Sequence, residues 1–292
     1  MTGFRYVLVS LFLSLFLFNG CAFVNMDLGN LTQLQPFEER VLKEGASDKI
    51  LVVEILGLIR TTDSHSSFMP RQGTYERLEN VLEKAKDDKK IKGIILKIDS
   101  PGGGYTASDL IYKRIHEFKT TKSIPVVSCI VDQGTSGGYM VALSSDYIVA
   151  LPSSVVGNVG VLMPSISLGG LMDKLGIADQ TIKSGKLKDA GTPLRDMSED
   201  EKAILKSIVM EFSTNFIERL KSSRPVTKED LVTIQDGRVM TATTGKSLHL
   251  IDEIGYYEDA LKKMESLTSV KDPTVVVYRR RGENMGGFYT WP

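Results

Sequence analysis

The fold of this chain is most constrained by two apolar runs, each of which ends in a cluster of glycines and is followed by a helix-like segment. The first run, Gly93–Ile98, leads into Asp99–Gly104, and the second, Ile124–Val131, leads into Gln133–Gly138. Neither run alternates between polar and apolar side chains, which is typical of strands buried on both faces. The strand–helix alternation therefore predicts an α/β chain with a parallel sheet.

Ser136 lies between glycines at the second of these corners, in the order Gly134-Thr135-Ser136-Gly137-Gly138. Glycines allow a sharp turn, and free N–H groups at a helix N-terminus stabilise nearby negative charge. A serine in this setting is more often a turn or cap residue than a nucleophile. The triple glycine of the first corner favours the nucleophile instead. Two such corners on neighbouring parallel strands can direct two N–H groups at one oxyanion.

A nucleophilic serine needs a base to accept its proton, and histidine is the usual base. The histidines of this chain are His65, His116 and His249, and none of them lies between Ser136 and residue 248. A Ser-His-Asp triad is therefore disfavoured, and a Ser-Lys dyad is the economical alternative.

The candidate bases lie in the turn at 183–189, which contains Lys183, Lys186 and Lys188. Spacing alone does not choose among the three lysines. A lysine that acts as a base must be neutral near pH 7, which requires desolvation or a nearby positive charge. Without the glycine corners, the same turn would be interpreted as a solvated basic loop.

Four motifs occur in a fixed order along the chain: Asp99–Gly104, Gly134–Tyr139, Gly157–Val161 and Ser184–Asp189. Together they resemble signal peptide peptidase A, a family of bacterial membrane-bound Ser/Lys proteases. The resemblance implies a ClpP/crotonase-like α/β fold of repeated β-β-α units with additional C-terminal helices. It further implies cleavage of signal peptides left behind by secreted proteins, and homo-oligomeric rings whose dyads can be completed across subunits.

The same resemblance assigns roles by position. Ser136 would be the nucleophile and Lys188 the general base, while Gly103 and Gly137 would donate the N–H groups of the oxyanion hole. Asn158 stands where the family has a serine that hydrogen-bonds the lysine amine. Since an asparagine carbonyl oxygen can accept the same bond, Asn158 is expected to position the lysine.

Residues 1–24 have the pattern of an export signal, with an apolar run over Tyr6–Phe18 and Cys21 after it. Gly20-Cys21 resembles a lipoprotein processing site, at which Cys21 would be lipidated. The alternative is an uncleaved membrane anchor from about Phe4 to Val24. Both alternatives predict a catalytic part that is tethered to a bacterial membrane on its extracytoplasmic side.

The rest of the chain is predicted to divide into a polar linker at 25–47, a peptidase domain at 48–270 and a C-terminal tail at 271–292. Ser198 and Glu201 have the spacing of a capping box and predict the start of a long helix. The apolar stripe of that helix would belong to the core or to a subunit interface.

The 36 basic and 36 acidic residues cancel, so the charge balance gives no indication of nucleic-acid binding. No cofactor or metal site is predicted, and the expected partners are apolar signal peptides, the membrane and further copies of the chain. The predicted function is a membrane-tethered serine endopeptidase. Two alternatives stay open: a crotonase-like acyl-CoA enzyme with the same oxyanion hole, and a pseudoprotease scaffold in which Asn158 impairs the dyad.

Overall fold

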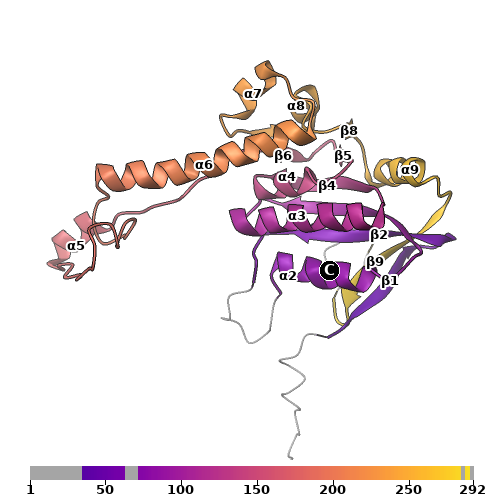
Figure 1. Cartoon of the computed structure of the whole chain (residues 1–292), viewed down its shortest axis with the longest axis horizontal. Coiled ribbons are helices and arrows are strands. Elements are labelled where there is room, and N and C mark those ends of the chain that lie inside the picture. The colour runs from indigo at the N-terminus through magenta and orange to yellow at the C-terminus, as the bar shows by residue number, and fades with distance from the viewer. Residues whose placement is uncertain (1–34, 63–71, 284–286, 290–292) are drawn as a thin grey trace, which may run out of the picture. The chain divides into compact units, whose positions relative to one another are not determined.

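The computed structural model describes residues 35–62, 72–283 and 287–289. These residues form a nine-stranded sheet with helices on both faces (Figure 1). The strands are β1 (Phe37–Lys43), β2 (Ala46–Leu56), β3 (Ile91–Ser100), β4 (Val126–Thr135), β5 (Tyr147–Ala150), β6 (Val155–Gly157), β7 (Val239–Thr241), β8 (Glu253–Ile254) and β9 (Pro273–Arg280). The helices are α2 (Thr74–Ala85), α3 (Tyr105–Lys122), α4 (Gly137–Ala142), α5 (Gly169–Leu175), α6 (Glu199–Ser223), α7 (Lys228–Ile234), α8 (Ala242–Ser247) and α9 (Tyr257–Thr268).

The sheet has the order β1-β9-β2-β3-β4-β5-β8, and β6 and β7 branch from β4. Strands β2, β3, β4 and β5 pair in parallel, as the unbroken apolar runs predicted. Because β3 and β4 are neighbours, the two glycine corners that follow them lie at the same edge of the sheet. This edge carries the site described below.

Helices cover both faces of the sheet, and each face has its own apolar core. Leu96 and Ile98 of β3 point into a cluster that includes residues of α2, α3 and α4. Ile95 of the same strand and Cys129 of β4 point to the other face, where α9 packs. The alternation of neighbouring β3 residues between two cores explains why the run contains almost no polar side chain.

Two strands lie in segments that were predicted to be a linker and a tail. β1 falls inside 25–47 and pairs antiparallel with β9, which falls inside 271–292 and also pairs in parallel with β2. The sheet therefore extends beyond the predicted domain at both ends. Charged residues obscured the pattern of β9, because Arg279 is buried against Glu54 rather than exposed.

Helix α6 begins at the predicted capping box, in which Ser198 and Glu201 each accept a hydrogen bond from the other's backbone N–H. Near its C-terminal end α6 packs on α3: Phe212 stacks on Tyr105 with 4.6 Å between ring centroids, and Arg219 pairs with Asp109 at 2.6 Å. Phe216 on the same stretch of helix is buried. The predicted apolar stripe is thus a core element only in its C-terminal half.

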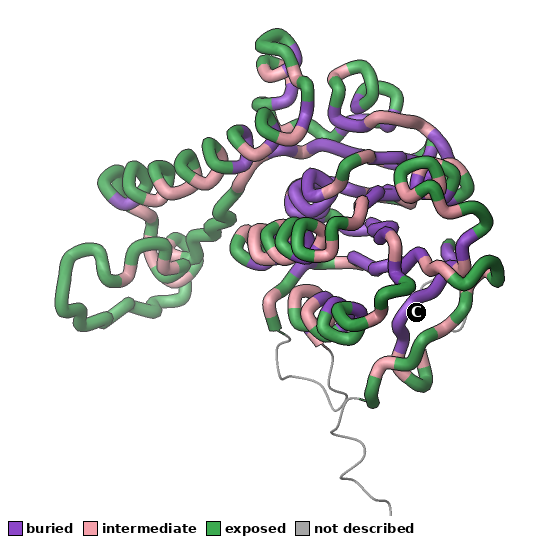
Figure 2. Tube along the Cα trace, turned by 45° about the vertical axis from the view of Figure 1, so that its right-hand side comes forward, coloured by how far each residue is buried: buried purple, intermediate pink, exposed green. Residues whose placement is uncertain are grey.

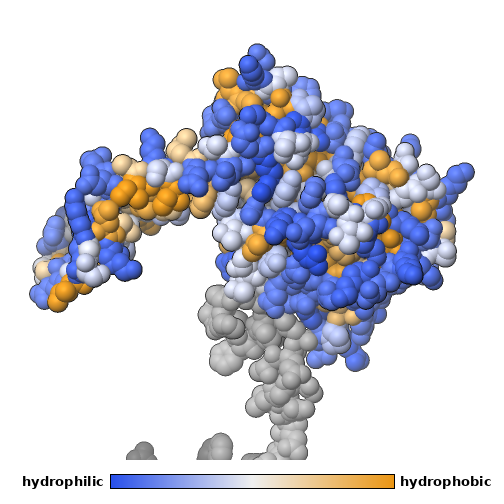
Figure 3. Space-filling model, in the orientation of Figure 1, coloured by the Kyte–Doolittle hydropathy of each residue, from blue (hydrophilic) through white to orange (hydrophobic). Residues whose placement is uncertain are grey.

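Residues 162–210, which we call the exposed segment, run from the end of the site loop through α5 into α6. Glu201 is the only buried residue among them (Figure 2). Residues 180–183 form no strand, and Ile182 is 99% exposed. Apolar side chains lie on the surface of this segment, over α6 among other places (Figure 3), and include Leu162, Ile166, Leu171, Leu175, Ile177 and Met210.

Within residues 35–62, 72–283 and 287–289, no helix combines the length and apolar character needed to cross a bilayer. The predicted signal or anchor at 1–24, with Cys21, lies outside the described residues.

Candidate active site

Ser136 occupies a strained turn between β4 and α4. Its backbone angles are φ 50° and ψ −122°, a conformation that non-glycine residues rarely adopt. Two hydrogen bonds hold the turn: the Ser136 N–H donates to the Gly157 carbonyl at 2.9 Å, and the Ser136 carbonyl accepts from the Met140 N–H at 2.9 Å. Backbone strain of this kind clusters at functional sites, where it fixes the direction of a side chain.

Ser136 lines a cavity of about 450 Å³, a volume typical of ligand pockets. Three other residues singled out from the sequence, Gly103, Gly137 and Asn158, line the same cavity. The remaining lining residues are Pro101, Tyr105, Ser108, Met140, Gly160, Val161, Leu162, Phe216 and Gly237, most of which are apolar. Four of the five residues assigned to the catalytic chemistry are therefore brought together by the fold.

Gly103 and Gly137 lie next to each other and line the same cavity. Within the described residues, neither N–H has a hydrogen-bond acceptor. A Cβ atom built on Gly137 would lie 3.3 Å from the Gly103 nitrogen, so the two corners are in direct contact. Two unpaired N–H groups beside a serine hydroxyl form a concavity suited to an anionic oxygen.

Two glycines of the corner before α3, Gly102 and Gly103, have no room for a side chain. A Cβ on Gly102, whose φ is +97°, would lie 2.9 Å from the Ser136 Cβ and 2.6 Å from the Gly137 nitrogen. The corner is anchored by side chains at its two ends. Ser100 Oγ donates to the Gly57 carbonyl at 2.6 Å, and Ser108 Oγ donates to the Gly104 carbonyl at 3.0 Å.

Gly103→Ala is expected to lower the free energy of unfolding by about 1–3 kcal/mol, the usual cost of forcing an atom into packed structure. The new Cβ would lie 2.2 Å from the Ile59 carbonyl oxygen and would disrupt the bridge between the two residues. Gly104→Ala is the matched control, since its nearest neighbour would be 3.8 Å away. Urea unfolding of both variants checks this expectation, and equal midpoints would contradict it.

Asn158 has a left-handed backbone, with φ 52°, which asparagine adopts more readily than most residues. Its N–H donates to the Arg238 carbonyl at 2.8 Å, and its side-chain Nδ2 donates to the Gly237 carbonyl at 2.5 Å. No donor within the described residues reaches its Oδ1. The side chain thus lines the cavity with an acceptor that is available to an incoming N–H group.

Lys188 does not line this cavity. It lies in the exposed segment, where its N–H bonds the Gly185 carbonyl at 3.1 Å. The other two candidate lysines are engaged: Lys183 Nζ bonds Asp189 at 2.7 Å, and Lys186 Nζ bonds Asp200 at 2.8 Å. The Lys188 ammonium has no hydrogen bond or ion pair among the residues that the structure describes. One chain therefore presents the serine and an unengaged lysine at separate places.

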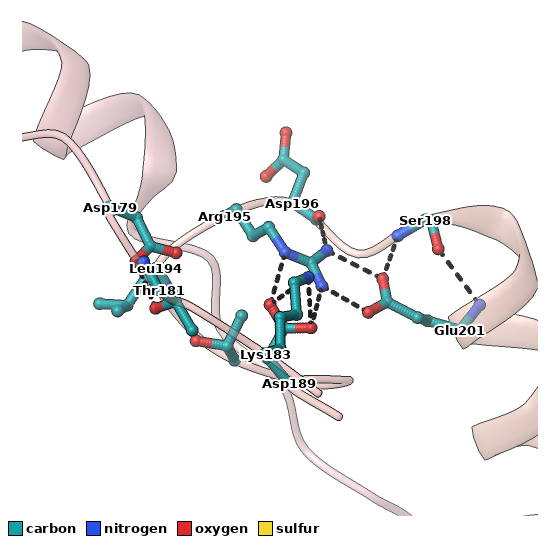
Figure 4. A network of polar contacts seen from close by, with 10 residues as sticks. Asp179, Thr181, Lys183, Asp189, Leu194, Arg195, Asp196, Ser198 and Glu201 are labelled. Atoms are coloured by element: carbon teal, nitrogen blue, oxygen red, sulfur yellow. Dashed lines mark hydrogen bonds and ion pairs between the residues drawn. The ribbon is translucent and has the colours of Figure 1, made fainter. Parts of the chain in front are cut away.

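The turn that carries Lys188 belongs to a polar network that local sequence patterns do not predict (Figure 4). Arg195 binds both Asp189 and Glu201, and its hydrogen bond helps to hold the pKa of the Asp189 carboxyl well below its usual range. The same guanidinium is the main cause that lowers the pKa of Glu201 to about 2. The one sequence signal for this network was Glu201 in the capping box.

An α/β sheet that presents a serine at a strained strand-to-helix turn, beside two free backbone N–H groups, has the site architecture of a hydrolase that acts through a serine nucleophile.

Comparison with known proteins agrees with this class. A model of peptidase family S49 matches residues 118–271. The chain is 39% identical over 209 residues to a candidate protease of Methanocaldococcus jannaschii, covering 72% of this chain and 66% of that protein. It is 33% identical over 242 residues to a candidate signal peptide peptidase, SppA, of Enterococcus faecium, covering 82% and 70%. The chain thus spans about two thirds of the length of these relatives.

Among solved structures, a membrane protease specific for a stomatin homolog from Pyrococcus horikoshii aligns with 80% of this chain and 92% of its own, at 18% identity and a TM-score of 0.41. The chain belongs to peptidase family S49 and is a serine-type protease. This assignment confirms the resemblance drawn from the four ordered motifs. The sheet with helices on both faces confirms the predicted α/β class. Membership of this family also favours the predicted serine protease over a crotonase-like acyl-CoA enzyme.

Proposed function

We propose that this chain is a membrane-tethered endopeptidase that cleaves apolar peptides, remnant signal peptides among them, with a Ser136–Lys188 dyad. The observation that carries this function is the position of Ser136, strained at a helix start and next to the free N–H groups of Gly103 and Gly137.

The reaction would proceed by acyl transfer. The neutral amine of Lys188 accepts the hydroxyl proton as Ser136 Oγ attacks the peptide carbonyl carbon. The N–H groups of Gly103 and Gly137 bind the resulting oxyanion, a contribution typically worth about 2.7–4 kcal/mol for one donor. The lysine then protonates the leaving amine, and water hydrolyses the acyl-enzyme with the same lysine as base.

Lys188 would reach Ser136 from another copy of the chain. Three observations support this arrangement: the Lys188 ammonium is unengaged, it lies on an exposed segment with apolar side chains on its surface, and the Asn158 Oδ1 is an open acceptor in the cavity. In a ring, the exposed segment of one subunit would bury its apolar side chains against a neighbour. Asn158 would then accept a hydrogen bond from the incoming amine.

The lining of the cavity favours an apolar peptide. Met140, Val161 and Phe216 offer apolar contacts, and the polar side chains of Ser108 and Asn158 line the same cavity as Ser136. The residues after β6 that line the cavity, Gly160–Leu162, belong to no strand and can pair with an extended substrate backbone. Backbone pairing and apolar contacts together support an extended, apolar peptide as the substrate.

The site of action would be a membrane surface. Residues 1–24 supply the export signal, by which the catalytic part would stand outside the cytoplasm. The tether is either a lipid on Cys21 or an uncleaved apolar anchor, the two alternatives that the sequence offers.

Ser136→Ala is expected to reduce hydrolysis of an apolar fluorogenic peptide at least about 1,000-fold, because no other group can replace the nucleophile. Ser222→Ala is the matched control: its hydroxyl is exposed on α6 and bonds only the Arg219 carbonyl. The measurement is kcat/KM for the full chain in detergent or lipid.

Hydrolysis that survives in Ser136→Ala would assign the nucleophile elsewhere. A correctly assembled wild-type chain that hydrolyses no peptide would instead support the pseudoprotease alternative. In that case Asn158→Ser should create activity, since it restores the serine that the resembling family has at this place.

A further inference from the structure

We propose that Arg195 is a positioning residue for the dyad: it occupies the carboxylate of Asp189, which would otherwise compete for the neighbouring Lys188 amine, and fixes the lysine-bearing turn to the start of α6. This inference rests on the proposed role of Lys188 as the base. It goes beyond that role because it concerns a residue that touches neither substrate nor Ser136.

Both oxygens of Asp189 are engaged by cations other than Lys188. Arg195 Nε bonds Oδ2 at 3.1 Å, and its Nη2 lies 2.9 Å from Oδ1. Lys183 Nζ bonds Oδ1 at 2.7 Å and Oδ2 at 2.8 Å. The Asp189 side chain is only 12% exposed. With four close contacts on two oxygens, this carboxylate has little capacity left for a third cation.

The other end of Arg195 is bound to α6. Its Nη1 and Nη2 donate to the two carboxylate oxygens of Glu201 at 3.0 Å and 2.6 Å, a bidentate pair. Glu201 also accepts the Ser198 N–H at 2.7 Å in the capping box. Its side chain is 2% exposed, although the segment around it is exposed. The guanidinium thus connects the lysine-bearing turn to the most buried polar group of this region (Figure 4).

An arginine suits the position between Asp189 and Glu201 for a chemical reason. A lysine base must lose its proton, and an unshielded carboxylate next to it favours the charged ammonium. Lys183 and Arg195 offset the charges of Asp189 and Glu201, and Lys186 is paired with Asp200. These charged residues of the turn and of the start of α6 are therefore paired with one another, and none of the pairs includes Lys188.

The capping of α6 does not require Arg195, because Ser198 and Glu201 complete the capping box between themselves. A structural role for Arg195 alone would therefore affect stability but not the pH at which the base works. This difference separates a positioning residue from a scaffold residue.

The test is the pH dependence of kcat/KM in the full-length chain. Arg195→Met exposes the Asp189 carboxylate and is expected to move the acid limb of the profile to higher pH by about one unit, with about a tenfold lower kcat at pH 7 and little change in KM. Arg195→Lys should recover part of this loss, because it keeps one cation but not the fork. Lys202→Met is the control, since the single ion pair of Lys202 within the described residues is to exposed Glu199 on the same helix.

Asp189→Asn tests the same inference by removing the carboxylate that Arg195 occupies. It removes the carboxylate while Arg195 stays, so the acid limb should move to lower pH, and Arg195→Met combined with Asp189→Asn should return the limb toward its wild-type position. An unmoved limb in both single variants would overturn the inference, even where the rate falls. Lys188→Ala distinguishes a failure of this inference from a failure of the proposed function. If Lys188→Ala keeps its activity, Lys188 is not the base. If Lys188→Ala loses its activity while the acid limbs of the other two variants do not move, Lys188 is the base but Arg195 does not position it.

Discussion

A one-to-one mixture of Ser136→Ala and Lys188→Ala chains is expected to hydrolyse peptide, although each variant alone does not. If the dyad forms between subunits, a Lys188→Ala chain still offers Ser136 to the lysine of a Ser136→Ala neighbour. In a randomly mixed ring with head-to-tail contacts, one ordered pairing in four is productive, so the expected rate is about a quarter of wild type. Peptide hydrolysis after dissociation and reassembly of the two variants is the measurement.

The control for this experiment is a chain that carries both substitutions. Mixed with either single variant, the double variant should give no activity, because one member of the dyad is then missing from every interface. If mixed assemblies form without any recovery, Ser136 and Lys188 must act within one chain. That outcome would require the exposed segment to fold back on its own cavity, which the described conformation does not do.

Glu54→Ala is expected to lower the free energy of unfolding by about 3–5 kcal/mol, the usual cost of removing one partner from a buried ion pair. Glu54 lies on β2 with its side chain 2% exposed, and its Oε1 is 2.7 Å from Arg279 of β9 and 3.4 Å from Lys97 of β3. The substitution would remove the buried carboxylate that Arg279 and Lys97 share between three strands. The shift of the urea unfolding midpoint measures the effect.

Glu83→Ala is the matched control for Glu54→Ala. Glu83 also pairs with a lysine, Lys86, but its side chain is 60% exposed on α2. Exposed pairs of this kind contribute little to stability, so the midpoint should stay close to that of the wild type. Similar midpoints for the two variants would show that water reaches the Glu54 cluster and that β9 does not depend on it.

The strands and helices nearest the site could be predicted because local pattern and burial coincide there. Gly93–Ile98 is apolar on both faces because β3 is buried on both faces, and the glycines after it are required where the two corners touch. The capping box of Ser198 and Glu201 predicted the start of α6 because its hydrogen bonds are local. The turn at Ser136 followed from the same local signals, whereas the roles of Ser136, Gly103 and Gly137 in catalysis come from the family resemblance and stay predictions.

The edge of the sheet could not be predicted in this way. The pattern of β9 is interrupted by Arg279, and its meaning depends on Glu54, which is 225 residues away in the chain. Without that partner an arginine indicates an exposed tail. The stripe on α6 was ambiguous for a related reason: periodicity identifies an apolar face, but what covers that face is a matter of tertiary structure and assembly.

The sequence by itself determined the family, the α/β class, the serine at a strand-to-helix turn and the glycines that leave two N–H groups free, because each of these is encoded by neighbouring residues. The choice among Lys183, Lys186 and Lys188 was different. Only the tertiary structure showed that the first two are engaged by Asp189 and Asp200 and that Arg195 completes the network. Ion pairs depend on where side chains meet in space, and the spacing of charges along a turn does not specify that.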